Sequence, residues 1–79
     1  MKTPRNLNGT DFAASLVRHW RYRYVHQSGS HIIIDTEEPF HQRLSVPNHK
    51  PLKSGTLNAL VRLAAVHKGV TKQDILNSL

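Results

Sequence analysis

The first regular pattern in the chain is a set of hydrophobic residues at the spacing of an α-helix. These residues recur at i, i+3, i+4 and i+7, positions that share one face of a helix: Ala13, Leu16, Val17 and Trp20. Just before them, Asn8 stands at an N-cap position and Asp11 follows three residues later, the arrangement of a capping box. We therefore predict a helix from Gly9 to Trp20, preceded by a flexible terminus over residues 1–6.

Between Tyr22 and Pro47 the hydrophobic spacing changes to two residues, the period of a β-strand. The alternating hydrophobic positions fall into three pairs: Tyr22 and Tyr24, Ile32 and Ile34, Leu44 and Val46. Two segments rich in turn-forming residues, Ser28 to Ser30 and Glu37 to Pro39, divide the region. The pattern predicts three short antiparallel strands joined by tight turns.

The remainder of the chain returns to helical spacing. Leu57, Leu60, Val61 and Ala64 form a second hydrophobic stripe, and Gly69 is the expected left-handed residue at its end. A capping box formed by Thr71 and Asp74 then predicts a short third helix. The complete order predicts an α+β fold, with helices packed on one face of a three-stranded antiparallel sheet and a short C-terminal helix appended.

Size and charge narrow the class of protein. A chain of 79 residues is expected to form one domain, residues 1–79, and the absence of cysteine excludes disulfides and thiolate metal sites. No hydrophobic run approaches the roughly 20 residues of a membrane span, so we expect a cytoplasmic protein with no membrane partner. Eleven Lys and Arg against five Asp and Glu give a net charge of +6, which favours nucleic acid, or else an acidic protein, as partner.

Two motifs resemble those of a known family. HQSGSHIII, residues 26–34, is similar to the Gln-x-Gly-Ser-His signature of HicA-type toxins, and VPNHKPLKSGTL, residues 46–57, resembles their second motif, Val-Pro-x-His followed by Gly-Thr-Leu. The closing VTKQDILNSL also resembles the family, so the similarity extends from about residue 7 to the end. Two positions depart from it, because His26 stands where the family has arginine and Arg21 where it has glycine.

The resemblance implies a fold, an activity and a partner. The fold is a double-stranded-RNA-binding-domain-like α-β-β-β-α arrangement, which agrees with the order derived above. The activity is that of a toxin in a type II toxin–antitoxin pair, an mRNA-cleaving endoribonuclease whose catalytic histidine maps to His31. The implied partners are mRNA and a HicB-type antitoxin, and no cofactor is expected.

His31 has chemistry suited to that activity. RNA cleavage without a metal uses the neighbouring 2′-hydroxyl as nucleophile, and an imidazole can accept or donate the protons involved near neutral pH. Strand alternation directs His31 away from the face of Ile32, Gly29 allows a close backbone approach to phosphate, and Ser30 adds a hydroxyl. Spacing alone favours an exposed strand-end histidine without a task, whereas the resemblance favours catalysis.

Further candidates for RNA contact surround the second motif. Lys50 and Lys53 precede the second helix, whose first turn contains the amides of Gly55 and Thr56; a helix N-terminus with two lysines is suited to phosphate. Three other residues are added: Arg43 as a cation on the polar sheet face, and Gln27 and His49 because they match the family motifs. For Arg43 a merely solvated charge is an equal alternative.

The other histidines and the aromatic residues have simpler interpretations. His19 and His67 are expected to be solvated or to compensate the dipoles of their helices, and His41 to lie on a face of the sheet. A zinc site made from His26, His31, His41 and His49 lacks cysteine and any recognised ligand spacing, so no metal site is predicted. Although aromatic side chains can stack on unpaired bases, Trp20, Tyr22 and Tyr24 are expected in the core.

Two other classes of function stay open at this point. One is a non-catalytic RNA-binding module of the same fold, and the other is a basic domain whose main role is protein association. The sequence offers one good candidate for proton transfer, His31, and no obvious second one.

Overall fold

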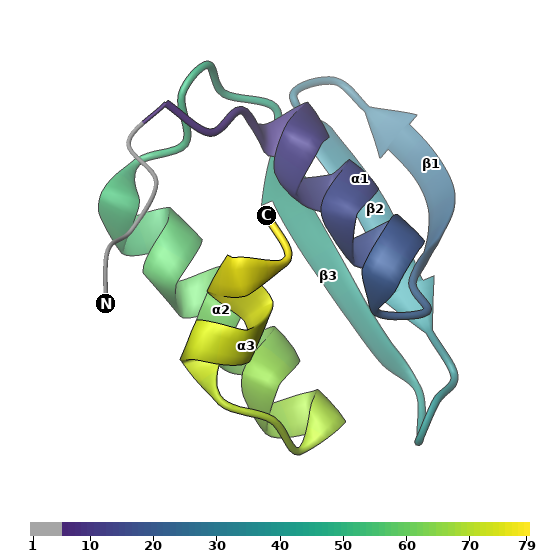
Figure 1. Cartoon of the computed structure of the whole chain (residues 1–79). Helices are drawn as coiled ribbons and strands as arrows, with labels where there is room; N and C mark the ends of the chain where they lie inside the picture. The colour runs from purple at the N-terminus through teal and green to yellow at the C-terminus, as the bar shows by residue number, and fades with distance from the viewer. Residues whose placement is uncertain (1–5) are drawn as a thin grey trace.

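The computed structural model describes residues 6–79, so the predicted flexible terminus lies, apart from Asn6, outside the described residues. Six elements follow one another along the chain (Figure 1): α1 (Gly9–His19), β1 (Arg23–Ser28), β2 (His31–Thr36), β3 (Gln42–Pro47), α2 (Ser54–Lys68) and α3 (Lys72–Asn77). The predicted α+β order of helix, three strands, helix and short helix is confirmed.

The three strands form one antiparallel sheet in the order β1-β2-β3. Gly29 joins β1 to β2 with a φ of 55°, the left-handed conformation that glycine adopts without steric cost. Within β2, Ile32 and Ile34 are buried on one face, whereas His31 and Ile33 point to the other. The sheet therefore has a helix-covered face and an open face, and His31 belongs to the open face.

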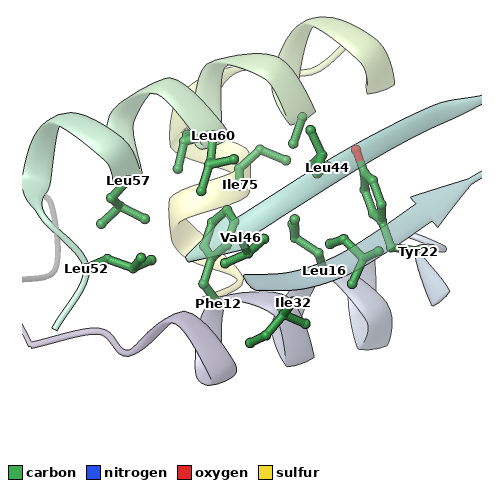
Figure 2. Packing of buried hydrophobic residues seen from close by; sticks show 14 of the residues in the cluster. Phe12, Leu16, Tyr22, Ile32, Leu44, Val46, Leu52, Leu57, Leu60 and Ile75 are labelled. Atoms are coloured by element: carbon green, nitrogen blue, oxygen red, sulfur yellow. The ribbon is translucent and has the colours of Figure 1, made fainter. Parts of the chain in front are cut away.

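The hydrophobic core lies between the covered face of the sheet and the helices. Figure 2 shows Phe12 and Leu16 from α1 and Leu57 from α2 directed toward Val46 of β3. Phe12, Leu16 and Val46 are completely inaccessible to solvent, and burial of each such side chain contributes about 1.5–3 kcal/mol. This packing fixes the strands, and with them the turn that precedes His31.

The ends of the helices agree with the sequence in part. The capping box of α3 is confirmed, since Thr71 Oγ1 accepts from the Asp74 amide at 3.1 Å and Asp74 Oδ2 accepts from the Thr71 amide at 3.0 Å. The capping box predicted for α1 is wrong, because the Asn8 side chain makes no capping hydrogen bond. The first turn of α1 is held instead by another segment, the backbone carbonyl of His49.

Arg21 follows α1 with a φ of 63°. This left-handed conformation places the Cβ of an L-residue close to the following carbonyl oxygen and costs roughly 1–2 kcal/mol. The sequence departure noted at this position, arginine where the resembling family has glycine, thus falls at a backbone conformation that suits glycine.

One of the aromatic predictions is wrong. Tyr22 is buried and Trp20 packs against the core, as expected, but the side chain of Tyr24 is 55% exposed. Tyr24 lies on β1, an edge strand whose residues are all exposed, and the register with β2 shifts between Tyr24 and His26. The helices cover β2 and β3, so a residue at the margin of the sheet stays open to solvent.

Two histidines also differ from expectation. His67 is buried rather than solvated, with Nε2 donating to the Phe40 carbonyl at 2.7 Å and its ring edge-on to the Phe40 ring at 4.4 Å. His41 lies in the loop before β3 rather than on the sheet, where its Nδ1 contacts Glu37 Oε2 at 2.8 Å. Both histidines therefore have structural contacts.

The described helices can also be compared with the dimensions of a bilayer. Within residues 6–79 none of them combines the length and the apolar character that a membrane crossing requires.

Candidate functional site

The two motifs that are distant in sequence meet at one end of the sheet. Ser30 comes directly before β2 and Asn48 directly after β3, and the Asn48 amide donates to the Ser30 carbonyl at 2.6 Å. In the adjoining row of the sheet, His31 pairs with Pro47. The Gly-Ser-His turn and the Val-Pro-Asn-His segment therefore form one continuous piece of surface.

The start of α1 is bound to the same place. The Gly9 amide donates to the His49 carbonyl at 3.0 Å, and the Leu52 amide donates to the Leu7 carbonyl at 2.9 Å. A Cβ atom on Gly9 would lie 1.9 Å from the Pro47 carbonyl oxygen, so only glycine permits this close approach. Figure 1 shows the β1–β2 turn, the start of α1 and the loop of residues 48–53 at the same end of the molecule.

His31 is an exposed residue at this junction. It is the first residue of β2 and pairs with Ser28 on one side and Pro47 on the other, so its backbone position is fixed by both neighbouring strands. The Ser30 hydroxyl lies 3.4 Å from His31 Nδ1. This contact engages the inner ring nitrogen and leaves Nε2, at the tip of the ring, available to an external group.

The start of α2 follows loop 48–53, and lysine residues lie before its first turn. Lys53 is the N-cap residue in an extended conformation, and the first turn, which contains Gly55 and Thr56, has no acidic residue. His49, Lys50 and Lys53 are exposed. The partial positive charge of the helix terminus is therefore reinforced by nearby lysines and opposed by no carboxylate in the turn.

Arg43 lies on the same open face as His31 but at the other end of the strands. Its row pairs with Asp35, four residues along β2 from His31, a separation of about 13 Å at 3.3 Å per residue. The structure therefore does not bring Arg43 beside His31. Gln27 is close to His31 along the sheet, since it pairs with Ile32, but this pairing places its side chain on the opposite, helix-facing side.

Sequence reasoning did not single out Asp35, which is only 3% exposed on the open face of the sheet. Arg23 Nε donates to its Oδ1 at 2.8 Å, and Arg43 Nη2 lies 3.8 Å from its Oδ2. The hydrogen bond from Arg23 lowers the pKa of Asp35 below its usual range, and the same bond raises the pKa of Arg23. A signal was available in part, because an arginine lies on each of the strands that flank this carboxylate, Arg23 on β1 and Arg43 on β3, but their pairing with Asp35 is seen only in the fold.

Asp35 also belongs to the group of possible metal ligands found within residues 6–79. The ligand atoms of Asp35, Glu37 and His41 lie within 4.8 Å of one another. Arg23 contacts both carboxylates, and His41 contacts Glu37, so these atoms already have partners in each other and in Arg23. The four histidines considered for zinc do not form such a group in the described part of the chain.

Comparison with known proteins agrees with this arrangement. Residues 15–66, more than half of the chain, match the model of the family described as HicA toxin of bacterial toxin–antitoxin systems. The matched range contains both the Gly-Ser-His turn and the Val-Pro-Asn-His segment. The chain belongs to the HicA toxin family, which implies an antitoxin as its partner. Searches of the curated proteins and of the solved structures return no significant match.

Proposed function

We propose that this toxin is a metal-independent endoribonuclease that cleaves mRNA, with His31 as its catalytic residue. The observation that carries the proposal is the hydrogen bond between Ser30 and Asn48, which unites the two family motifs around an exposed imidazole. One well-placed proton-transfer group is enough for a slow nuclease, since general acid–base catalysis contributes about a hundred- to ten-thousand-fold in rate.

In the proposed reaction the 2′-oxygen attacks the adjacent phosphorus while its proton is removed. The bond from phosphorus to the 5′-oxygen breaks, and the departing oxygen receives a proton, which leaves a 2′,3′-cyclic phosphate and a 5′-hydroxyl. Nε2 of His31 performs one of these two proton transfers. The Ser30 hydroxyl, 3.4 Å from Nδ1, orients the ring, and Gly29 gives the phosphate room beside the backbone.

Loop 48–53 and the start of α2 hold the RNA backbone in this proposal. Lys50, Lys53 and His49 contact phosphate from the exposed loop, and the amides of Gly55 and Thr56 contribute the positive end of the helix. Arg43 binds the backbone farther along the open face, about 13 Å from the cleavage point. Such contacts locate the RNA without reading its sequence.

The proposal also specifies the partner and the place of action. We infer that the antitoxin is of the HicB type and that the whole chain acts as one domain in the cytoplasm. The net charge of +6 favours an acidic surface on this partner, because complementary charges speed association and fix its orientation.

The central test is induction of the wild-type chain and of His31→Ala in separate cultures, with growth and message integrity followed over time. The wild type should deplete mRNA and arrest growth, whereas His31→Ala should do neither. His19→Ala, which removes an exposed histidine from α1, is the matched control and should behave as the wild type. Equal depletion of mRNA by the wild type and His31→Ala, or depletion by neither, would overturn the assignment of His31.

A second test addresses the chemistry with purified protein. RNA carrying a single 2′-deoxy residue at the cut site should resist cleavage at that site, and a chelator should leave cleavage of ordinary RNA unchanged. Continued cutting at the deoxy position excludes the 2′-hydroxyl mechanism. RNA binding without any cleavage identifies the non-catalytic module, and antitoxin binding without RNA binding identifies the protein-association domain.

A further inference from the structure

A cavity of about 310 Å³ lies between β1 and the start of α1, at the edge of the sheet. Its walls are mainly apolar and come from α1, β1 and β2: Thr10, Tyr24, His26, Gln27 and Ile32. Small-molecule sites begin at about this volume and typically combine apolar walls with a few polar groups. The cavity has this composition, since the aromatic ring of Tyr24 and the carboxamide of Gln27 both line it.

A register shift in β1 places two of the lining residues, Tyr24 and Gln27, on the same side of the sheet. Tyr24 pairs with Ile34 and Gln27 pairs with Ile32, so both side chains project to the helix-facing side although they are three residues apart. In a regular strand residues three apart point to opposite faces. The shift between Tyr24 and His26 inserts Val25 as an extra residue and brings the two side chains onto one side, as bulges beside functional sites commonly do.

We propose that this cavity binds one unstacked nucleobase of the RNA, next to the cleaved bond. The Tyr24 ring, 55% exposed, stacks on the face of the base, and the Gln27 carboxamide, which is both donor and acceptor, pairs with its edge. The inference rests on the proposed ribonuclease function and adds to it a preference for the base at one position. It also assigns a role to Gln27 that the general phosphate contacts do not provide.

The position of the cavity relative to His31 supports a neighbouring nucleotide. Gln27 and Ile32 form the row of the sheet that directly follows the Ser28–His31 row. His31 points to the open face and Gln27 to the covered face, so an RNA strand that reaches both must cross the free edge of β1. His26 also lines the cavity. The family motif has arginine at this position, so the wall of the cavity differs here in charge and shape from the family pattern.

The chemistry of the cavity favours a base over a phosphate or a peptide. Among residues 6–79, none of those that line it is lysine, arginine or a carboxylate, so these walls offer no fixed charge for a phosphate or for a charged peptide side chain. An aromatic face with one carboxamide is the combination by which proteins bind unpaired bases, through stacking and edge hydrogen bonds. The basic loop 48–53 can hold the phosphates of the same strand.

The test measures binding in the His31→Ala background, so that the RNA stays intact. A short single-stranded RNA carries 2-aminopurine, a fluorescent base, at each position around the cut site in turn, and a parallel series carries an abasic residue. One position should show quenching on binding, and an abasic residue at that position should weaken binding roughly ten-fold, the scale of a lost stacking contact. The other positions should change little.

Variants then assign the effect to the cavity. In the same background, Tyr24→Ala should weaken binding about ten-fold and abolish the quenching, whereas Tyr24→Phe should retain both because the stacking face remains. Gln27→Ala should reduce the difference in affinity between RNAs that differ only in this base. Phe40→Ala, which removes an equally exposed aromatic ring (61%) in the β2–β3 loop, should bind as the parent.

Two outcomes overturn the inference: abasic and ordinary RNA bind equally at every position, or Tyr24→Ala binds and quenches like its parent. Both are independent of whether His31 cleaves RNA. If His31→Ala proves to cleave like the wild type, the catalytic assignment fails, and the comparison of Tyr24→Ala with Tyr24→Phe is made on RNA that carries a 2′-deoxy residue at the cut site, which still decides the base dependence of binding.

Discussion

Ser30 and Asn48 are joined by a backbone hydrogen bond of 2.6 Å, and through it the residues on either side occupy one surface. His31 follows Ser30 and His49 follows Asn48. The candidate catalytic residue and the basic loop 48–53 therefore come from different motifs, and this hydrogen bond connects them. Because the attachment uses main-chain atoms, it depends on the path of the backbone more than on the side chains at these two positions.

Gly9→Ala tests that path. A methyl group 1.9 Å from the Pro47 carbonyl oxygen forces α1 away from loop 48–53, so unfolding should become easier by about 1–3 kcal/mol, the usual cost of overpacking. The amides of Gly9, Asn48 and Leu52 should also exchange hydrogen faster. Gly55→Ala is the matched control: its Cβ has no neighbour within 4 Å, and alanine is the better helix residue. Denaturant unfolding and amide exchange measure both variants, and equal destabilisation of the two would contradict the structure.

Lys50→Ala combined with Lys53→Ala should weaken RNA binding and flatten its dependence on salt. Each phosphate contact that is lost lowers the slope of log K against log salt by about 0.7 for single-stranded nucleic acid. The double variant Arg18→Ala and Lys72→Ala removes the same charge from other helices and should keep the slope close to that of the wild type. Binding is titrated at several salt concentrations, and an unchanged slope in the loop variant would move the phosphate surface elsewhere.

Arg21→Gly should stabilise the protein. The left-handed φ of 63° destabilises the folded state with arginine by roughly 1–2 kcal/mol, and glycine removes this cost. Glycine also raises the entropy of the unfolded chain, which offsets about 0.4–1 kcal/mol of the gain. The expected net gain is about 0.5–1 kcal/mol in the free energy of unfolding, because the exposed ion pair with Glu38 contributes little. Arg21→Ala removes the same side chain but keeps the strained conformation, so it should show no comparable gain in urea unfolding.

Tyr22 should make the protein sensitive to alkali. Burial raises the pKa of Tyr22 to about 12 from an ordinary value near 10. Because the folded state holds the proton more tightly, the resulting stability is complete below pH 10 and is lost as the pH rises toward 12. Two pKa units correspond to roughly 3 kcal/mol. Phenylalanine cannot ionise, so the free energy of unfolding of Tyr22→Phe should fall less than that of the wild type as the pH rises above 10. Unfolding curves at pH 8, 10 and 11 compare the two chains.

Asp35 should act in the opposite direction, at acid pH. The hydrogen bond from Arg23 lowers the pKa of Asp35, so its ionised form stabilises the folded state above the ordinary range of aspartate, near pH 4. This stability is lost as the pH falls through the lowered value. Asp35→Asn keeps the shape of the side chain without its charge, so its stability should fall less than that of the wild type between pH 5 and pH 2. Parallel losses in both chains would assign the acid sensitivity to other carboxylates.

Much of this fold could be predicted because its core follows simple periods. The stripe through Ala13 and Leu16 and the alternation of Ile32 with Ile34 correspond directly to buried faces. His67 was missed although it lies three residues after Ala64 on the buried stripe of α2, so the periodicity did contain the signal. His67 was expected to be solvated because histidine is hydrophilic, although its position on the helix indicated burial.

Other features depend on contacts that no local pattern contains. Tyr24 pairs with Ile34 and so projects to the helix-facing side, as the period of the strand predicts, but it is exposed because β1 lies at the edge of the sheet, beyond the cover of the helices. The Asn8 side chain makes no capping hydrogen bond, and the start of α1 is attached through the Gly9 amide to the carbonyl of His49, a residue distant in the chain. The position of His31 at the start of its strand was predicted from the sequence, whereas the proximity of His31 to loop 48–53 could be seen only in the folded structure.

The tight contact at Gly9 has a genetic consequence. If a toxic copy of this chain is expressed in growing cells, the survivors will carry changes that inactivate it, and codons for residues that contact RNA are only some of the targets. Every single-base change that replaces Gly9 introduces at least a Cβ where the Pro47 carbonyl oxygen already lies. A screen for escape mutants should therefore yield substitutions of Gly9 as well as of His31. The set of inactivating positions would then include residues that maintain the fold in addition to residues that contact RNA.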